Sequence, residues 1–138
     1  MGSEMCIRDS NGWSRRKRRG VLMTTIVLWV SNLEKSVSFY KALFEAPTAY
    51  VTEGFASVAN RENEVLLHLL PEQYRSEPTL GEDNPIKPVF EVQSIAKAQL
   101  AAGQNGGRIK SDTSEHESWR YADGNDPDGH VIQVRERI

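Results

Sequence analysis

Cysteine is almost absent from this chain, because Cys6 is the only one among 138 residues. One cysteine cannot form an intrachain disulfide, so the sequence lacks the framework typical of small secreted domains. Long apolar runs are absent too, and none approaches the roughly 20 residues that a membrane-spanning helix needs. We therefore expect a cytoplasmic protein that does not act in a membrane. Its length and its hydrophobic content of 38% are sufficient for one domain with one core.

The basic residues are unevenly distributed along the chain. Residues 1–22 hold six of the 17 basic residues but two of the 19 acidic ones. The segment 2–10 looks like a translated sequencing adapter, and 15–20 looks like a translated ribosome-binding site before Met23. We expect 1–22 to be a non-native or disordered extension and the native domain to span 23–138. That domain is acidic, which argues against a nucleic-acid partner because phosphates require a basic surface.

The native segment contains one pattern twice. In the first half (about 23–70), we expect a strand at 24–30, a helix from 33 to about 46 and strands at 49–53, 55–59 and 65–70. Ser31 is the expected N-cap of that helix, with Glu34 completing a capping box. In the second half (about 86–138), we expect a strand at 87–92, a helix at 95–102 capped by Ser94, and strands at 108–110, 119–123 and 130–136. Residues 71–85 are rich in proline and charge, which is typical of a linker.

This repeat predicts an α+β fold in which two βαβββ modules pair into a curved, cup-shaped mixed sheet with the helices outside. Three local features accompany it: the passage 30–40 with its Phe-Tyr pair, the Asp-Pro-Asp-Gly turn that leads into 130–134, and Trp119 before the penultimate strand. Together they resemble the vicinal oxygen chelate superfamily, which includes glyoxalases, extradiol dioxygenases and bleomycin-resistance proteins. The resemblance covers essentially all of 23–138.

The superfamily is named for a divalent metal ion that holds two neighbouring substrate oxygens. Its ligands are usually His or Glu at four strand positions, and the resemblance places these positions at Thr25, His68, Lys87 and Gln133. Only His68 is a good ligand type, since the Lys87 ammonium repels cations and the Thr25 and Gln133 oxygens are weak ligands. We therefore expect no bound metal and no cofactor.

Strand alternation sorts the remaining side chains by face. One face becomes a mainly apolar cup with a few polar groups, a mixture typical of small-molecule sites. The candidate ligand-binding residues on it are Trp29, His68, Glu91, Trp119, Tyr121 and Gln133.

Each candidate has a structural alternative. Trp29 equally fits the core or a dimer interface, and a hydrogen-bonded structural role is the alternative for His68. Lys87 and Glu91 lie four residues apart on the same strand face and could form a salt bridge with each other. Trp119 and Tyr121 could line the cup or only rim it.

Three functions remain open. The leading one is a metal-independent protein of the bleomycin-resistance type that sequesters an aromatic or apolar compound in a cup completed by homodimerisation. The second is a lyase, isomerase or dioxygenase-like enzyme in which His68 is the general base and Lys87 or Glu91 its charge partner. The third is a structural or regulatory subunit whose cup is filled by its own side chains.

Overall fold

The computed structural model describes residues 4–6, 15–17, 24–75 and 85–138. Near the N-terminus, β1 (Glu4–Cys6) and β2 (Arg15–Lys17) pair as antiparallel strands. The rest of 1–23 lies outside the described residues, so the assignment of 1–22 as a non-native extension stays a prediction. Most of the expected linker, residues 76–84, also lies outside them. The linker begins with a short 3₁₀ helix, η1 (Glu72–Tyr74).

The first module forms a four-stranded sheet with one helix. Its strand order is β3-β6-β5-β4, with β3 parallel to β6 and the other neighbours antiparallel. The order along the chain matches the predicted strand–helix–strand–strand–strand unit, although the strand expected at 49–53 is only two residues long. The elements are β3 (Thr25–Val30), α1 (Leu33–Phe44), β4 (Tyr50–Val51), β5 (Phe55–Ala59) and β6 (Glu64–Leu69).

The second module repeats this topology. Its strands follow the order β7-β11-β10-β8, with β7 parallel to β11, and a short extra strand, β9, pairs with β10. The elements are β7 (Val89–Glu91), α2 (Ile95–Gln104), β8 (Arg108–Ile109), β9 (Ser114–His116), β10 (Trp119–Asn125) and β11 (Val131–Arg137). The predicted α+β class and the two βαβββ modules are therefore confirmed. Ser94 caps α2 as predicted, because its side chain accepts a hydrogen bond from the Lys97 backbone N–H.

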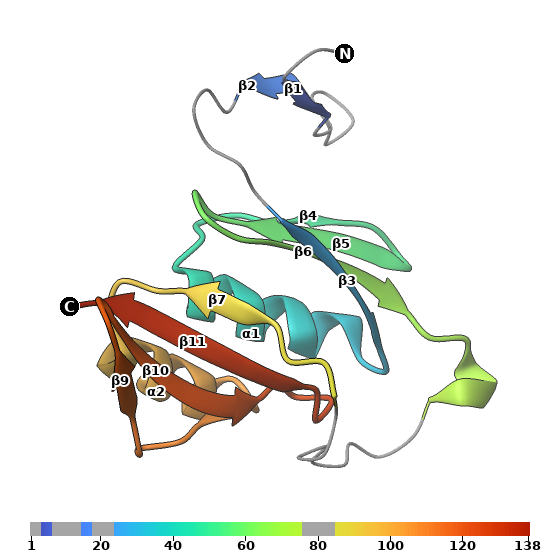
Figure 1. Cartoon of the computed structure of the whole chain (residues 1–138). Coiled ribbons are helices and arrows are strands. Elements are labelled where there is room, and N and C mark those ends of the chain that lie inside the picture. The colour runs from blue at the N-terminus through green and yellow to red at the C-terminus, as the bar shows by residue number, and fades with distance from the viewer. Residues whose placement is uncertain (1–3, 7–14, 18–23, 76–84) are drawn as a thin grey trace.

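The hydrophobic core joins the modules. Figure 1 shows α1 beneath the first sheet, with β7 crossing in front of it. Tyr40 and Phe44 of α1 meet Phe90 of β7, with ring centroids 5.9 and 5.2 Å apart, respectively. All three residues are at most 4% exposed, and they belong to one cluster of buried residues drawn from both modules. The strands of the two modules form two separate sheets, and the modules are held together by side chains.

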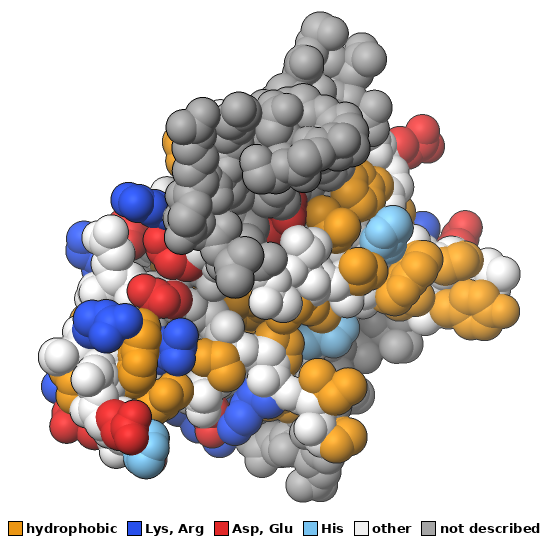
Figure 2. Space-filling model, turned by 45° about the horizontal axis from the view of Figure 1, so that its top comes forward, with side chains coloured by type: hydrophobic (Ala, Val, Ile, Leu, Met, Phe, Trp, Pro, Cys, Tyr) orange, Lys and Arg blue, Asp and Glu red, His pale blue; other side chains and the backbone are white. Residues whose placement is uncertain are grey.

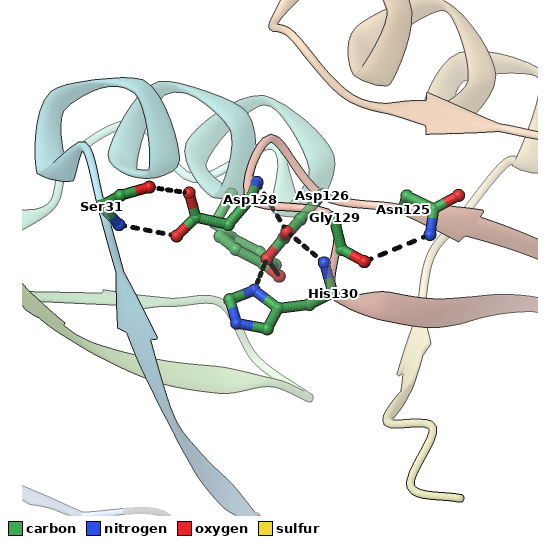
Figure 3. A network of polar contacts seen from close by, with 7 residues as sticks. Ser31, Asn125, Asp126, Asp128, Gly129 and His130 are labelled. Carbon is green, nitrogen blue, oxygen red and sulfur yellow. Dashed lines mark hydrogen bonds and ion pairs between the residues drawn. The ribbon is translucent and has the colours of Figure 1, made fainter. Parts of the chain in front are cut away.

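A buried polar network also ties the turn between β10 and β11 to the first module (Figure 3). The Asp126 carboxylate is 2% exposed and accepts hydrogen bonds from the Tyr40 hydroxyl and from His130 Nδ1, both at 2.7 Å. Asp128 of the same turn accepts hydrogen bonds from the Ser31 backbone N–H, at 2.7 Å, and from the Ser31 hydroxyl. Gly129 permits the turn because its φ is +86°, a conformation that residues with a side chain rarely adopt.

This network changes the proton affinity of two of its members. The hydrogen bond to Asp126 raises the pKa of His130, and desolvation partly opposes that effect. The charges of Asp126 and Asp128 and a hydrogen bond to the Trp29 backbone also raise it. Burial and the Asp126 charge raise the pKa of the Tyr40 phenol well above its ordinary value. Both groups therefore stay protonated to a higher pH than they would in water.

Candidate functional site

The candidate site lies on the face of each sheet that points away from the helices, which we call the open face. In the first module, the pairing of β3 with β6 arranges this face in three rows: Thr25 beside Glu64, Val27 beside Leu66, and Trp29 beside His68. Val27 is 50% exposed and Trp29 is 52% exposed. Figure 2 shows hydrophobic side chains gathered around histidine side chains on the surface in view. The strand alternation read from the sequence therefore placed Trp29 on the correct face.

The aromatic end of this surface is built from three strands. The Trp29 and His68 rings lie 4.9 Å apart between centroids, and the Phe55 ring of β5 lies 5.0 Å from His68. The exposure of Trp29 excludes the alternative in which it fills the core. Within the described chain, His68 makes ring contacts and no hydrogen bond, which does not fit a structural histidine fixed by hydrogen bonding. Both side chains can therefore contact a ligand that lies on the open face.

Glu64 lies at the opposite end of the same surface, and the sequence analysis did not name it as a candidate binding residue. Glu64 is 3% exposed, and its carboxylate accepts hydrogen bonds from the hydroxyls of Thr25, at 2.7 Å, and Ser57, at 3.4 Å. The sequence could have indicated this position, because Glu64, Leu66 and His68 are alternate residues of one strand and therefore lie on the same face. The expected strand at 65–70 began one residue too late to include it.

In the second module, a polar cluster occupies the two positions that the resemblance assigns to metal ligands. Lys87 Nζ lies 3.1 Å from Asp123 Oδ1, and Gln133 Nε2 donates a hydrogen bond to the same oxygen at 2.7 Å. Partial burial opposes ionisation of Asp123, but these hydrogen bonds and the charges of Lys87 and Lys110 lower the pKa of its carboxyl group. Lys87 thus pairs with Asp123, and the salt bridge considered between Lys87 and Glu91 does not form.

Glu91 and Trp119 are connected through an arginine. Arg135 Nη2 lies 3.9 Å from Glu91 Oε1, and its guanidinium carbon lies 3.8 Å from the centre of the Trp119 ring. Arg137 also lies over that ring, at 4.2 Å. Two guanidinium groups therefore already lie over the Trp119 ring and make cation–π contacts with it. We expect this tryptophan to position Arg135 and not to stack on a ligand.

Two hollows are each lined by both partners of one of these contacts, Glu91 with Arg135 or Asp123 with Gln133. A cavity of about 380 Å³ lies where the modules meet, and its lining includes Ile26, Val89, Glu91 and Arg135. A smaller hollow of about 210 Å³ includes Tyr121, Asp123 and Gln133 in its lining. The six candidates thus fall into three groups: Trp29 with His68, Glu91 with Trp119 at Arg135, and Tyr121 with Gln133 at Asp123. Neither hollow has Trp29 or His68 in its lining.

The strand register corrects one position of the expected metal site. Gln133 lies beside Val89 on the second module, and the equivalent pair on the first is Leu66 beside Val27. His68 lies two residues further along β6, so it is not the counterpart of Gln133. The four corresponding positions are then Thr25, Leu66, Lys87 and Gln133, and Lys87 is tied to Asp123.

These side chains do not fit a catalytic divalent metal ion. Leucine offers no ligand atom, and the lysine ammonium has no lone pair and repels a cation. In the described part of the chain, no three His, Cys, Asp or Glu side chains are grouped so that they could hold a metal ion.

Comparison with known proteins identifies the family. The profile of the glyoxalase/bleomycin resistance protein/dioxygenase superfamily matches residues 22–134. The chain belongs to this superfamily. No curated protein matches its sequence.

Several solved structures share its fold. A glyoxalase/bleomycin resistance protein from Albidiferax ferrireducens is 18% identical with a TM-score of 0.64, covering 83% of this chain and 97% of the other. The fosfomycin resistance protein FosX from Mesorhizobium loti is 15% identical with a TM-score of 0.59, covering 87% and 93%, respectively. A glyoxalase/bleomycin resistance protein/dioxygenase family enzyme from Burkholderia phytofirmans is 12% identical with a TM-score of 0.61, covering 83% and 97%. At these identities, the likeness establishes the fold of this superfamily member and not its ligand.

Proposed function

We propose that this superfamily member is a metal-independent protein that binds an apolar or aromatic small molecule on its open face. The observation that carries the proposal is the composition of the four metal-ligand positions. Two of them, Thr25 and Leu66, offer a hydroxyl and a hydrocarbon, and the other two, Lys87 and Gln133, are engaged with Asp123. Such a set can support binding without coordination chemistry.

The exposed aromatic and aliphatic surface supplies the affinity in this proposal. Val27 and Trp29 are each about half exposed, and the Trp29 ring lies against His68. Covering such side chains with a flat ligand removes apolar area from water and adds ring contacts. The enzymatic alternative has less support, because the charge partners proposed for His68 are engaged elsewhere: Lys87 pairs with Asp123 and Glu91 with Arg135.

The test uses the full chain, purified without a tag, and N-acetyl-dansylcadaverine, a neutral aromatic probe that reports binding by its fluorescence. We expect metal analysis to find far less than one equivalent per chain, and a chelator to leave probe affinity unchanged. Trp29→Leu should weaken binding by about tenfold, corresponding to about 1.4 kcal/mol of lost ring contact.

Tyr74→Leu is the matched control, because Tyr74 is an exposed aromatic residue on η1 (66% exposed). It should bind the probe like the wild type. A stoichiometric metal that binding requires, or equal affinity of the Trp29→Leu and wild-type proteins, would contradict the proposal.

A further inference from the structure

Among the described residues, the Glu64 carboxylate has no partner of opposite charge. Within residues 24–75 and 85–138, its oxygens accept hydrogen bonds from Thr25 and Ser57 and form no ion pair. Yet the residue is 3% exposed. Transfer of an ionised carboxylate from water into a protein is costly unless a positive charge or several strong donors compensate for it. Two neutral hydroxyls orient this carboxylate, but they do not neutralise it.

Among the described residues, the strand neighbours of Glu64 on the open face carry no Lys or Arg side chain. Along β6, its neighbours on the same face are Leu66 and His68, and His68 is engaged with the Trp29 and Phe55 rings. Thr25 of β3 and Ala59 of β5 lie beside it in the register. The arrangement therefore provides an oriented carboxylate that a cation from outside the chain could neutralise.

The rows of the open face give this site a length and a direction. Glu64 and His68 are four residues apart on one strand, which corresponds to about 13 Å at roughly 3.3 Å per residue. Val27 and Leu66 form the apolar row between them, and Trp29 lies beside His68 at the far end. The surface thus runs from a carboxylate, over an aliphatic middle, to a pair of aromatic rings.

We propose that the ligand of the open face is a cationic amphiphile: a primary amine or guanidine that binds Glu64, joined by an aliphatic linker to an aromatic ring that contacts Trp29. This assignment rests on the proposed function and adds the chemical class of the ligand. A charge-assisted hydrogen bond to a carboxylate is roughly twice as strong as a neutral one. We expect it to favour an amine over its uncharged analogue by at least about tenfold in affinity, or about 1.4 kcal/mol.

Three dansyl probes that share an aromatic ring and a chain of similar length test this class. Dansylcadaverine carries a terminal amine, N-acetyl-dansylcadaverine is neutral, and 6-(dansylamino)hexanoic acid carries a carboxylate. Each is titrated against the wild-type full chain at neutral pH. The expected order of affinity is amine, then neutral, then acid, and the preference should decrease as salt screens the charge.

The variant Glu64→Gln keeps the size of the side chain and one of its two acceptor oxygens but removes its charge. It should abolish the preference for the amine and leave the affinity for the neutral probe within about twofold of the wild type. Glu53→Gln is the matched control, because Glu53 is an exposed residue of the same module, and it should keep the preference. The melting temperature adds a separate readout: if Glu64 is an uncompensated charge, Glu64→Gln should melt at or above the wild-type temperature without ligand.

The outcomes separate this inference from the function on which it rests. If the three probes bind equally, if the acid binds best, or if Glu64→Gln keeps the amine preference, the ligand class is wrong while the binding function stands. A lower melting temperature of Glu64→Gln would assign Glu64 a structural role and would also overturn the inference. If none of the probes binds the wild type, the proposed function itself fails. The comparison of the three probes uses the wild-type protein alone, so it does not depend on whether a variant folds.

Discussion

At the scale of single residues, His130 shows how contacts between distant segments determine a side chain's chemistry. Its ring lies 2.7 Å from the buried Asp126 carboxylate and also bonds the Trp29 backbone, far away in the chain. In the sequence, His130 is only the residue after a tight turn, and neither contact could be derived from the residues around it. The same holds for the hydroxyl of Ser57, which meets Glu64 across two paired strands. By contrast, the exposure of Trp29 followed from simple strand alternation.

The raised pKa of His130 predicts a pH-dependent contribution to stability. The folded state holds this proton more tightly than the unfolded chain, in which the histidine pKa is about 6.5. The contribution is therefore fully present below that value and is lost as the pH rises through the higher folded-state pKa. His130→Gln should lower the free energy of unfolding, measured by urea denaturation, more at pH 5.5 than at pH 9. His116→Gln, on the exposed strand β9, is the control. An equal loss for His130→Gln at both pH values would show that the interaction with Asp126 does not depend on the proton.

At the scale of secondary-structure elements, the sequence predicted the type and order of strands and helices better than their ends. The helix expected from 33 to about 46 spans Leu33–Phe44, and the strand expected at 119–123 continues to Asn125. Strand β9 was not predicted, because its residues are polar and exposed and carry no hydrophobic alternation. Local pattern determines the type of each element, whereas neighbouring strands determine where pairing stops.

The start of α1 is a specific case. Ser31 was expected to cap this helix, but the cap is Asn32, whose Oδ1 accepts a hydrogen bond from the Lys35 backbone N–H at 3.0 Å. The Ser31 hydroxyl instead donates to Asp128 of the second module. Both residue types are good caps, so local preference could not distinguish them, and a partner 97 positions away decided the outcome.

The destabilisation caused by a Ser31 variant should therefore depend on Asp128, whereas that caused by an Asn32 variant should not. Asn32→Ala should destabilise the fold by about 1 kcal/mol through loss of the helix cap, whether or not Asp128 is present. The effect of Ser31→Ala should shrink in an Asp128→Asn background, with an interaction energy of at least about 0.5 kcal/mol. Double-mutant cycles based on chemical denaturation measure both terms. Additive effects of the Ser31 and Asp128 substitutions would show that this contact does not stabilise the joint between the modules.

At the scale of the whole molecule, the repeat in the sequence correctly predicted two equivalent modules. How they meet could not be predicted, because that depends on Tyr40 and Phe90 packing together and on the Asp126 network. In the described parts of the chain, no helix is long and apolar enough to cross a membrane. The cytoplasmic location and the absence of a nucleic-acid partner stay predictions.

Homodimerisation also stays a prediction, and it concerns the whole molecule. Val27, Trp29 and Val89 leave apolar area exposed on the open face, and a second copy would complete the cup by covering part of it. We expect light scattering coupled to size-exclusion chromatography to give twice the mass of one chain at micromolar concentration. A monomer that still binds the neutral dansyl probe would show that the site is complete within one chain.

The outer border of β7 is closed by a side chain of the other module. Asn63 accepts a hydrogen bond from the Glu91 backbone N–H at 3.1 Å and donates one to the Glu91 carbonyl oxygen at 2.8 Å. Its amide thus pairs with Glu91 as a peptide group of an adjacent strand would. Exposed strand borders recruit other chains and promote aggregation. At the place where the two halves adjoin, this asparagine therefore occupies the backbone groups of Glu91 that a strand of another chain would need for pairing.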